Sequence, residues 1–402
     1  MIGLVLEGGG AKGSYHVGAY KAILETGIEI QGVAGTSAGA LNGAMIVQGD
    51  FDICYSLWKE ISYSKVIDTD DEEIQKLQQL KLNMDDLKIL GEKIKSVVSD
   101  RGFDITPFKR LLDIYIDEEK IRRSNKDFGM VTVNLTDFKP MEIFKEDIPY
   151  GELKNYLLAS AYLPAFKTEK LGGKIYLDGA FYDNLPFSLL QQKGYRDLII
   201  IRTHAKGIVR RLDKEELNAI VISPSDDIGK SYTYESARAK KNIQLGYYDA
   251  LRMLKGLKGE RYYIKPLKDK DYYLNFLLSI EKEEIEKIGE IIHTPPIPER
   301  RALFEYIVPK LALGLGLSKD FTYEELLIGL LEKKAEQLDI PRFKIYSFEE
   351  LLDIVRCKIV IPREEDLEEP STIEKIIEKV DLATIFNKEE TILQVGDIIF
   401  SP

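Results

Sequence analysis

Gly8-Gly9-Gly10-Ala11-Lys12-Gly13 is the stretch that decides the fold of this chain, because it joins an apolar run at residues 2–6 to a helical pattern at residues 14–26. A short apolar run that ends at glycines is typical of a buried strand entering a tight loop. Residues 28–34 predict a second strand, and residues 38–47 predict a second helix of small side chains. This order predicts parallel strands with helices on the faces of the sheet.

The glycine loop, residues 8–13, is suited to binding an anion. Its backbone amides are unshielded, and the following helix begins with a partial positive charge. The spacing also satisfies G-x-G-x-x-G, but a dinucleotide fold needs an acidic residue at the end of the second strand. Glu29 opens that strand instead. A P-loop is excluded, because no Gly-Lys-Ser/Thr follows the first glycine at the required spacing.

Gly35-Thr36-Ser37-Ala38-Gly39 fits the G-x-S-x-G pattern of a nucleophile elbow between a strand and a helix. Gly35 and Gly39 allow neighbouring backbone to pass close by, so that the Ser37 hydroxyl projects above the sheet. Since the glycine loop follows the adjacent strand, its amides can stabilise an oxyanion formed at Ser37.

A serine nucleophile requires a general base, and the residues alone leave two possibilities. The chain order Ser37, Asp178, His204 permits a triad. Alternatively, Asp178 acts directly, since it ends a strand expected at residues 174–178 and partial burial would raise its pKa. The other two histidines, His16 and His293, lie in a helix and before a proline-rich stretch.

Composition narrows the class of protein. The 402-residue chain has a net charge of −11, which argues against a nucleic-acid binder. Cys54 and Cys357 form no disulfide framework or zinc pattern, so we expect reduced thiols, no metal and no cofactor. The N-terminus lacks a basic signal-peptide region, and no run of about 18 apolar residues exists. We therefore expect a cytoplasmic protein that meets lipid, if at all, at the membrane surface.

The remaining sequence predicts a helical insertion at residues 50–127 and a C-terminal helical region beyond the prolines of residues 294–298. We expect a catalytic domain over residues 1–294 and an accessory region over residues 299–402, with a break at the acidic segment 364–369. The further expected elements are strands at 128–135, 141–145, 197–203 and 219–223, and helices at 151–162, 232–255, 311–317, 323–337 and 348–355.

Three motifs together resemble the patatin-like phospholipase family: GGGAKG at 8–13, GTSAG at 35–39 and Asp178-Gly179-Ala180. The resemblance covers roughly residues 1–265 and includes Ala-Ser-Ala-Tyr-Leu-Pro at 159–164 and Asn-Leu-Pro at 184–186. It implies a modified α/β-hydrolase fold, a three-layer sandwich around a mostly parallel sheet. The residues after about 300 match no family that we recognise.

The resemblance also implies the chemistry. Ser37 would be the nucleophile and Asp178 the base of a dyad without histidine. The loop residues Gly8, Gly9, Gly10, Ala11, Lys12 and Gly13 would form the oxyanion hole. The expected substrates are phospholipids or other acyl esters, with residues 50–127 forming part of an acyl-chain pocket. A non-catalytic lipid-binding protein of the same fold is the alternative, and the C-terminal region is a candidate for partner binding or self-association.

Overall fold

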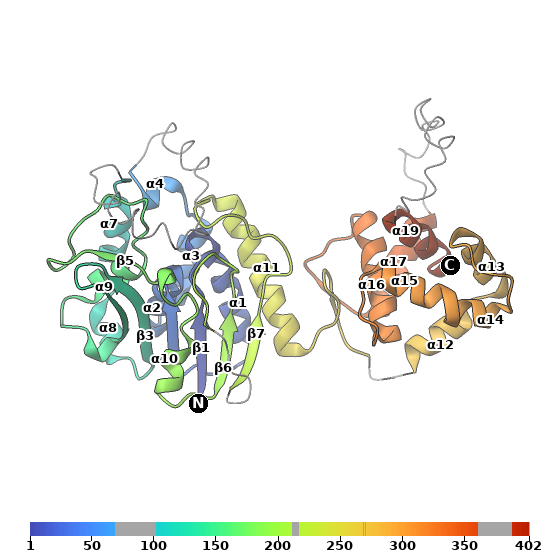
Figure 1. Cartoon of the computed structure of the whole chain (residues 1–402), viewed down its shortest axis with the longest axis horizontal. Helices are drawn as coiled ribbons and strands as arrows, with labels where there is room; N and C mark the ends of the chain where they lie inside the picture. The colour runs from blue at the N-terminus through green and yellow to red at the C-terminus, as the bar shows by residue number, and fades with distance from the viewer. Residues whose placement is uncertain (69–101, 211–216, 268, 270, 361–387, 402) are drawn as a thin grey trace, which may run out of the picture. The chain divides into compact units, whose positions relative to one another are not determined.

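The computed structural model describes residues 1–68, 102–210, 217–267, 269, 271–360 and 388–401. The chain divides into two compact units, Met1–Lys255 and Gly256–Pro402 (Figure 1). Among the described residues, no helix has the length and apolar character needed to cross a membrane.

A seven-stranded sheet forms the centre of the first unit, in the order β4-β3-β2-β1-β6-β7, with β5 paired to β3. The strands are β1 (Ile2–Leu6), β2 (Gly32–Thr36), β3 (Asp127–Asn134), β4 (Lys139–Phe144), β5 (Tyr176–Asp178), β6 (Asp197–Ile201) and β7 (Asn218–Ile222). Strands β3, β2, β1, β6 and β7 are parallel to one another, whereas β4 and β5 run antiparallel to β3. The mostly parallel sheet is confirmed.

Helices cover both faces of this sheet. Successive side chains of each strand point to opposite faces, so the apolar strands present side chains on both faces that the helices bury. On one face, Leu189 and Leu190 of α10 pack with Val5 and Ala34. On the other face, α2 approaches so closely that a Cβ on Gly43 would lie 3.0 Å from Val33. The three-layer α/β sandwich expected from the sequence is therefore confirmed.

The helices of the first unit are α1 (Ser14–Glu25), α2 (Ala38–Gln48), α3 (Phe51–Lys59), α4 (Tyr63–Val66), α7 (Thr106–Tyr115), α8 (Glu118–Arg123), α9 (Leu153–Ser160), α10 (Phe187–Gln192) and α11 (Ser236–Lys255), with 3-10 turns η1 (Gly10–Gly13), η2 (Lys145–Asp147) and η3 (Gly179–Phe181). The described part of the insertion expected at residues 50–127 contains four helices, α3, α4, α7 and α8, which are connected by non-helical segments. Residues 69–101 of it lie outside the described residues.

The second unit is mainly helical, as expected. It contains α12 (Tyr272–Ser279), α13 (Lys282–Ile291), α14 (Glu299–Ala302), the π-helix η4 (Leu303–Ile307), α15 (Val308–Gly314), α16 (Tyr323–Gln337), α17 (Phe348–Val360) and α19 (Lys388–Ile399), with strands β8 (Tyr263–Ile264) and β9 (Ile345–Tyr346) paired in parallel. The segment expected as a break at 364–369 lies outside the described residues.

The division between the units falls earlier than the boundary expected at residues 294–298. The physical reason is that residues after Lys255 already belong to the core of the second unit. Tyr262, Leu277 and Ile288 are buried there together with Leu327. The prolines therefore separate two helices, α13 and α14, within one unit.

Candidate active site

Ser37 occupies a strained turn between β2 and α2. Its backbone has φ 56° and ψ −126°, a region that residues other than glycine rarely adopt, and only 5% of its surface is exposed. The turn is tight, since a Cβ on Gly39 would lie 2.2 Å from the carbonyl oxygen of Leu6. This geometry is that of a nucleophile elbow, in which the helix N-terminus faces the serine.

Ser37 and Asp178 come together because two strands meet end to end beside β3. Strand β2 ends at Thr36, which is paired with Val131 of β3, and β5 ends at Asp178, which is paired with the next residue, Thr132. Strand β5 runs in the opposite direction to β2, so that the ends of both strands point at the same place. Asp178 thus reaches Ser37 from an antiparallel strand, and not from the carboxyl edge of a parallel one.

The Asp178 carboxyl group is buried, with 1% of the residue exposed. Its Oδ1 accepts a hydrogen bond of 2.8 Å from the Ala180 amide, whereas Oδ2 has no hydrogen-bond partner within the described part of the chain. Burial raises the pKa of Asp178 to about 6, although the nearby Ser37 hydroxyl and the Ala180 amide favour its charged form. A carboxylate with this pKa is suited to accept a proton near neutral pH.

The glycine loop presents two backbone amides that are not used within the fold. The amides of Gly8, Ala11 and Lys12 donate to the carbonyl oxygens of Asn184, Ser231 and Gly9. In contrast, the structure shows no acceptor for the amides of Gly9 and Gly10 among the residues that it describes. Gly10 has φ +54° and lines the same pocket as Ser37, so its amide is a candidate donor to a bound oxyanion.

Lys12 and His204 do not line the pocket that contains Ser37. The Lys12 ammonium donates to the carbonyl oxygens of Thr203 and His204, at 3.3 and 3.4 Å. The His204 amide donates to Glu7, and its side chain is exposed. The groups that shift the pKa of Asp178 do not include His204.

The other two histidines also lie outside the pocket that Ser37 lines. His16 is buried within α1, where desolvation lowers its pKa to about 3. His293 follows α13 in the second unit, with φ +54°. The described part of the chain therefore brings Asp178, and none of the three histidines, to Ser37.

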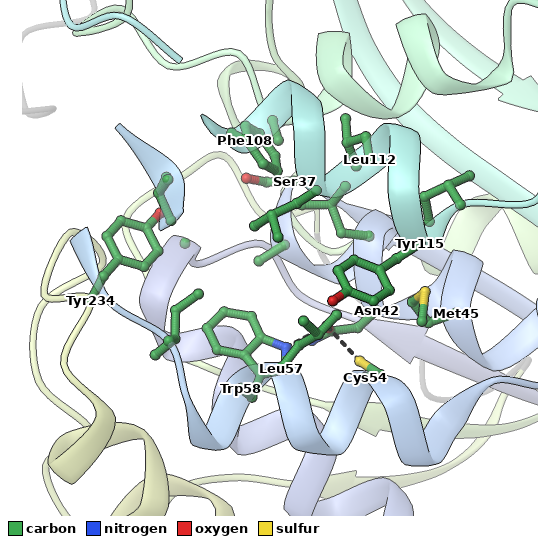
Figure 2. Close-up of a pocket in the computed structure, with 18 of the residues that line it drawn as sticks. Ser37, Asn42, Met45, Cys54, Leu57, Trp58, Phe108, Leu112, Tyr115 and Tyr234 are labelled. Atoms are coloured by element: carbon green, nitrogen blue, oxygen red, sulfur yellow. Dashed lines mark hydrogen bonds between the residues drawn. The ribbon is translucent and has the colours of Figure 1, made fainter. Parts of the chain in front are cut away.

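An apolar pocket opens beside Ser37, with about 870 Å³ of empty space including its mouth (Figure 2). Helices α2, α3 and α7 supply most of its wall, so the described part of the helical insertion contributes to it. Its apolar lining includes Leu41, Met45, Leu57, Trp58, Ile61, Val66, Phe108, Leu111, Leu112, Ile116, Leu163 and Phe166. Such a cavity can bury a hydrocarbon chain next to the serine.

Two residues that the motifs did not identify also lie at the site. Ser160, within the Ala-Ser-Ala-Tyr-Leu-Pro segment, accepts a hydrogen bond from the Ser37 amide. Tyr234 lines the pocket from the segment just before α11, a position that the sequence predicts as the first turns of that helix. No sequence signal identifies Tyr234, because it lies 197 positions away from Ser37 in the numbering of the chain.

Among the described residues, no group of three or more His, Cys, Asp or Glu side chains is arranged to bind a metal ion. The two cysteines are both free thiols, with Cys54 buried and Cys357 exposed.

Comparison with known proteins identifies relatives of the first unit. Residues 4–190 match the family model described as patatin-like phospholipase. A patatin-like phospholipase domain-containing protein of Caenorhabditis elegans is 27% identical over 201 residues, which are 50% of this chain and 16% of that protein. Neuropathy target esterase sws of Drosophila melanogaster is 30% identical over 201 residues, 50% of this chain and 13% of that protein. The aligned segment thus spans less than a fifth of each relative.

Among solved structures, VipD from Legionella pneumophila aligns with 98% of this chain and 91% of its own, at 15% identity and a TM-score of 0.39.

Proposed function

We propose that the protein is a serine hydrolase that cleaves carboxylic ester bonds of phospholipids or other acyl lipids. The match of residues 4–190 to the patatin-like phospholipase family model supports this proposal. The observation that carries this proposal is the meeting of Ser37 and Asp178 beside consecutive residues of β3. An apolar pocket adjoins both the serine and the glycine loop.

The reaction begins when the Ser37 hydroxyl attacks the ester carbonyl carbon and transfers its proton to Asp178. The tetrahedral oxyanion accepts hydrogen bonds from the amides of Gly9 and Gly10. As the intermediate collapses, the bond to the leaving alcohol breaks, and Asp178 returns the proton to that alcohol. Asp178 then accepts a proton from water, which attacks the acyl-enzyme carbonyl carbon. As the bond between Ser37 Oγ and the acyl group breaks, Asp178 returns this proton to Oγ, which releases the fatty acid and regenerates free Ser37.

We favour Asp178 as the direct base over a triad in which His204 is the base. The pKa of Asp178, about 6, leaves most of the carboxylate charged at neutral pH while keeping it basic enough to accept a proton. His204 is exposed, and its backbone is bound to Glu7 and Lys12. His204 is also absent from the lining of the pocket that contains Ser37, which supports Asp178 as the base.

The substrate class follows from the pocket. Its wall is apolar over α2, α3 and α7, so an acyl chain can bind there with its ester at Ser37. The proposed substrate therefore carries at least one fatty acyl chain, and the protein would reach it at a membrane surface.

We assign the second unit an accessory function. In the part of the chain that the structure describes, the Ser37 pocket is lined by residues of the first unit. A shortened chain that ends at Lys255 is expected to melt cooperatively and to hydrolyse a short soluble ester. A folded but inactive shortened chain would show that the second unit is required for catalysis.

Labelling with a fluorophosphonate tests the proposed function directly. The probe should form an adduct on Ser37, detected by peptide mass spectrometry, and Ser37→Ala should abolish both the adduct and the hydrolysis of acyl esters. Ser318→Ala, at an exposed serine of the second unit, is the matched control and should retain both. A wild type that neither labels at Ser37 nor hydrolyses acyl esters would favour the non-catalytic lipid-binding alternative. An active Ser37→Ala variant would instead show that another residue is the nucleophile.

A further inference from the structure

The hydroxyl group of Tyr234 enters the pocket beside the glycine loop. Tyr234 lines the pocket together with Ser37 and Gly10. A Cβ built on Gly10 would lie 3.3 Å from the Tyr234 hydroxyl oxygen, so this oxygen is next to one of the two unused amides. In Figure 2 the Tyr234 ring lies at the left edge of the pocket, and Ser37 lies to its right.

The segment that carries Tyr234 is anchored on both sides. Before it, the Ser231 carbonyl oxygen accepts a hydrogen bond of 2.7 Å from the Ala11 amide, which ties the segment to the glycine loop. After it, the Ser236 hydroxyl donates to the Lys59 carbonyl oxygen at 2.6 Å. The ring itself packs edge-on against Tyr63, with 6.0 Å between centroids. These contacts hold the segment and the ring in place, so the position of the hydroxyl oxygen is set before any substrate binds.

The Tyr234 hydroxyl is also available as a donor. The structure shows no hydrogen bond from it to any residue that is described. Burial, and then the charge of Asp178, raise the pKa of Tyr234 above its ordinary value, so the hydroxyl keeps its proton at neutral pH. A neutral, oriented donor that stays protonated suits an oxygen that gains negative charge during reaction.

We propose that Tyr234 is a catalytic residue whose hydroxyl donates a hydrogen bond to the ester carbonyl oxygen as it becomes the oxyanion, beside the amides of Gly9 and Gly10. No proton is transferred in this step. The proposal rests on the function proposed above. It gives this site a side-chain donor from the segment before α11, in addition to the backbone donors of the glycine loop.

The experiment compares Tyr234→Phe with Tyr63→Phe. The two substitutions each remove one hydroxyl from the same pair of rings, and the Tyr63 hydroxyl is buried without a partner among the described residues. We expect Tyr234→Phe to lower kcat for a soluble ester by about 10²- to 10³-fold with KM nearly unchanged, as for loss of one oxyanion donor. Tyr63→Phe should keep the wild-type kcat, and both variants should melt as the wild type does.

Three results would overturn the inference. One is a wild-type kcat in Tyr234→Phe, and another is an equal loss in both variants, which would assign the effect to packing. The third is a loss in Tyr234→Phe that moves the acidic limb of the pH profile to higher pH, which would assign the hydroxyl to Asp178 instead of the ester. If the wild-type protein neither hydrolyses esters nor labels at Ser37, the proposed function fails together with this inference. If the wild type and Tyr234→Phe are both fully active, the inference about Tyr234 is wrong but the proposed function stands.

Discussion

The Ser37 amide donates a hydrogen bond of 2.9 Å to the Ser160 hydroxyl, which in turn donates to the Val131 carbonyl oxygen at 2.6 Å. Ser160 ends α9 and is fully buried. One side chain thus connects the strained elbow to the middle strand against which β2 and β5 meet. The same bond occupies the Ser37 amide, so that this amide does not point to an oxyanion.

Ser160→Ala is expected to destabilise the protein by about 1–3 kcal/mol, because it leaves the buried Ser37 amide and Val131 carbonyl without this partner. Turnover should fall as well, since the elbow loses a support for its strained geometry. Thermal unfolding and ester hydrolysis measure the two effects. The control is Ser188→Ala, which removes a buried hydroxyl that has no partner in the described structure. Equal stability of the two variants would contradict this assignment.

Substitution separates the dyad from the triad. Asp178→Asn should reduce turnover of a soluble ester nearly to the level of Ser37→Ala, because an amide cannot accept the serine proton. His204→Ala should cost only a modest factor, since His204 lies outside the pocket. Circular dichroism first establishes that each variant is folded. A His204→Ala enzyme as inactive as Ser37→Ala, beside an active Asp178→Asn enzyme, would favour the triad.

The pH profile of kcat/KM should show an acidic limb with a midpoint of about 6, where Asp178 loses its charge. Below this pH the protonated carboxyl cannot accept the serine proton, so activity should fall about tenfold per pH unit. His204→Ala should keep the same limb, which distinguishes Asp178 from a titrating histidine. A midpoint near 4, the ordinary range of an aspartate, would contradict the buried base.

Asp178→Asn should also raise the melting temperature at pH 8. The folded pKa of Asp178, about 6, lies above the usual value of 3.8, so the folded state binds this proton more tightly than the unfolded state. The stability contributed by the group is fully present below about pH 4 and is lost as pH rises through 6. Asp178→Asn removes the buried negative charge and with it the destabilisation of the folded state at pH 8. The increase in melting temperature should therefore become smaller as the pH is lowered toward 4. A lower melting temperature at pH 8 would show that the carboxylate is stabilised in the fold.

Gly10→Ala should lower turnover by about 10²-fold, as for loss of an oxyanion donor. Its φ of +54° disfavours a side chain, and the new Cβ would lie 2.2 Å from the Ser231 carbonyl oxygen, so the loop must shift. Gly27→Ala is the matched control, since Gly27 has φ +74° with open space around its Cβ position. Both variants bear backbone strain, but only Gly10→Ala should lose activity in a folded protein. Full activity of Gly10→Ala would contradict the position of the oxyanion hole.

Several features of the fold followed from local patterns. The glycine loop, the G-x-S-x-G elbow and the Asp-Gly-Ala turn each impose a backbone geometry through residues adjacent in sequence. Strands β1, β6 and β7 were predicted from apolar runs, and α16 was predicted with the bounds that it has in the structure, Tyr323–Gln337. The second strand was misplaced, since β2 begins at Gly32 and extends through Thr36. The Gln31 amide donates a hydrogen bond to the Ile2 carbonyl oxygen, but the regular pairing with β1 begins at Gly32.

Local sequence is enough to predict that a serine follows a strand at an elbow and that a glycine loop follows the neighbouring strand, because both depend on short-range backbone constraints. Only the tertiary structure decided how Asp178 reaches Ser37, since the direction of β5 depends on its pairing with Thr132 of β3, far away in sequence. The same holds for Ser160 and Tyr234, whose hydroxyl groups become useful only where packing brings α9 and the segment before α11 to the elbow. The boundary between the units also depends on tertiary packing. Consecutive prolines suggested a boundary at residues 294–298, but Tyr262 and Leu277 are already buried in the core of the second unit.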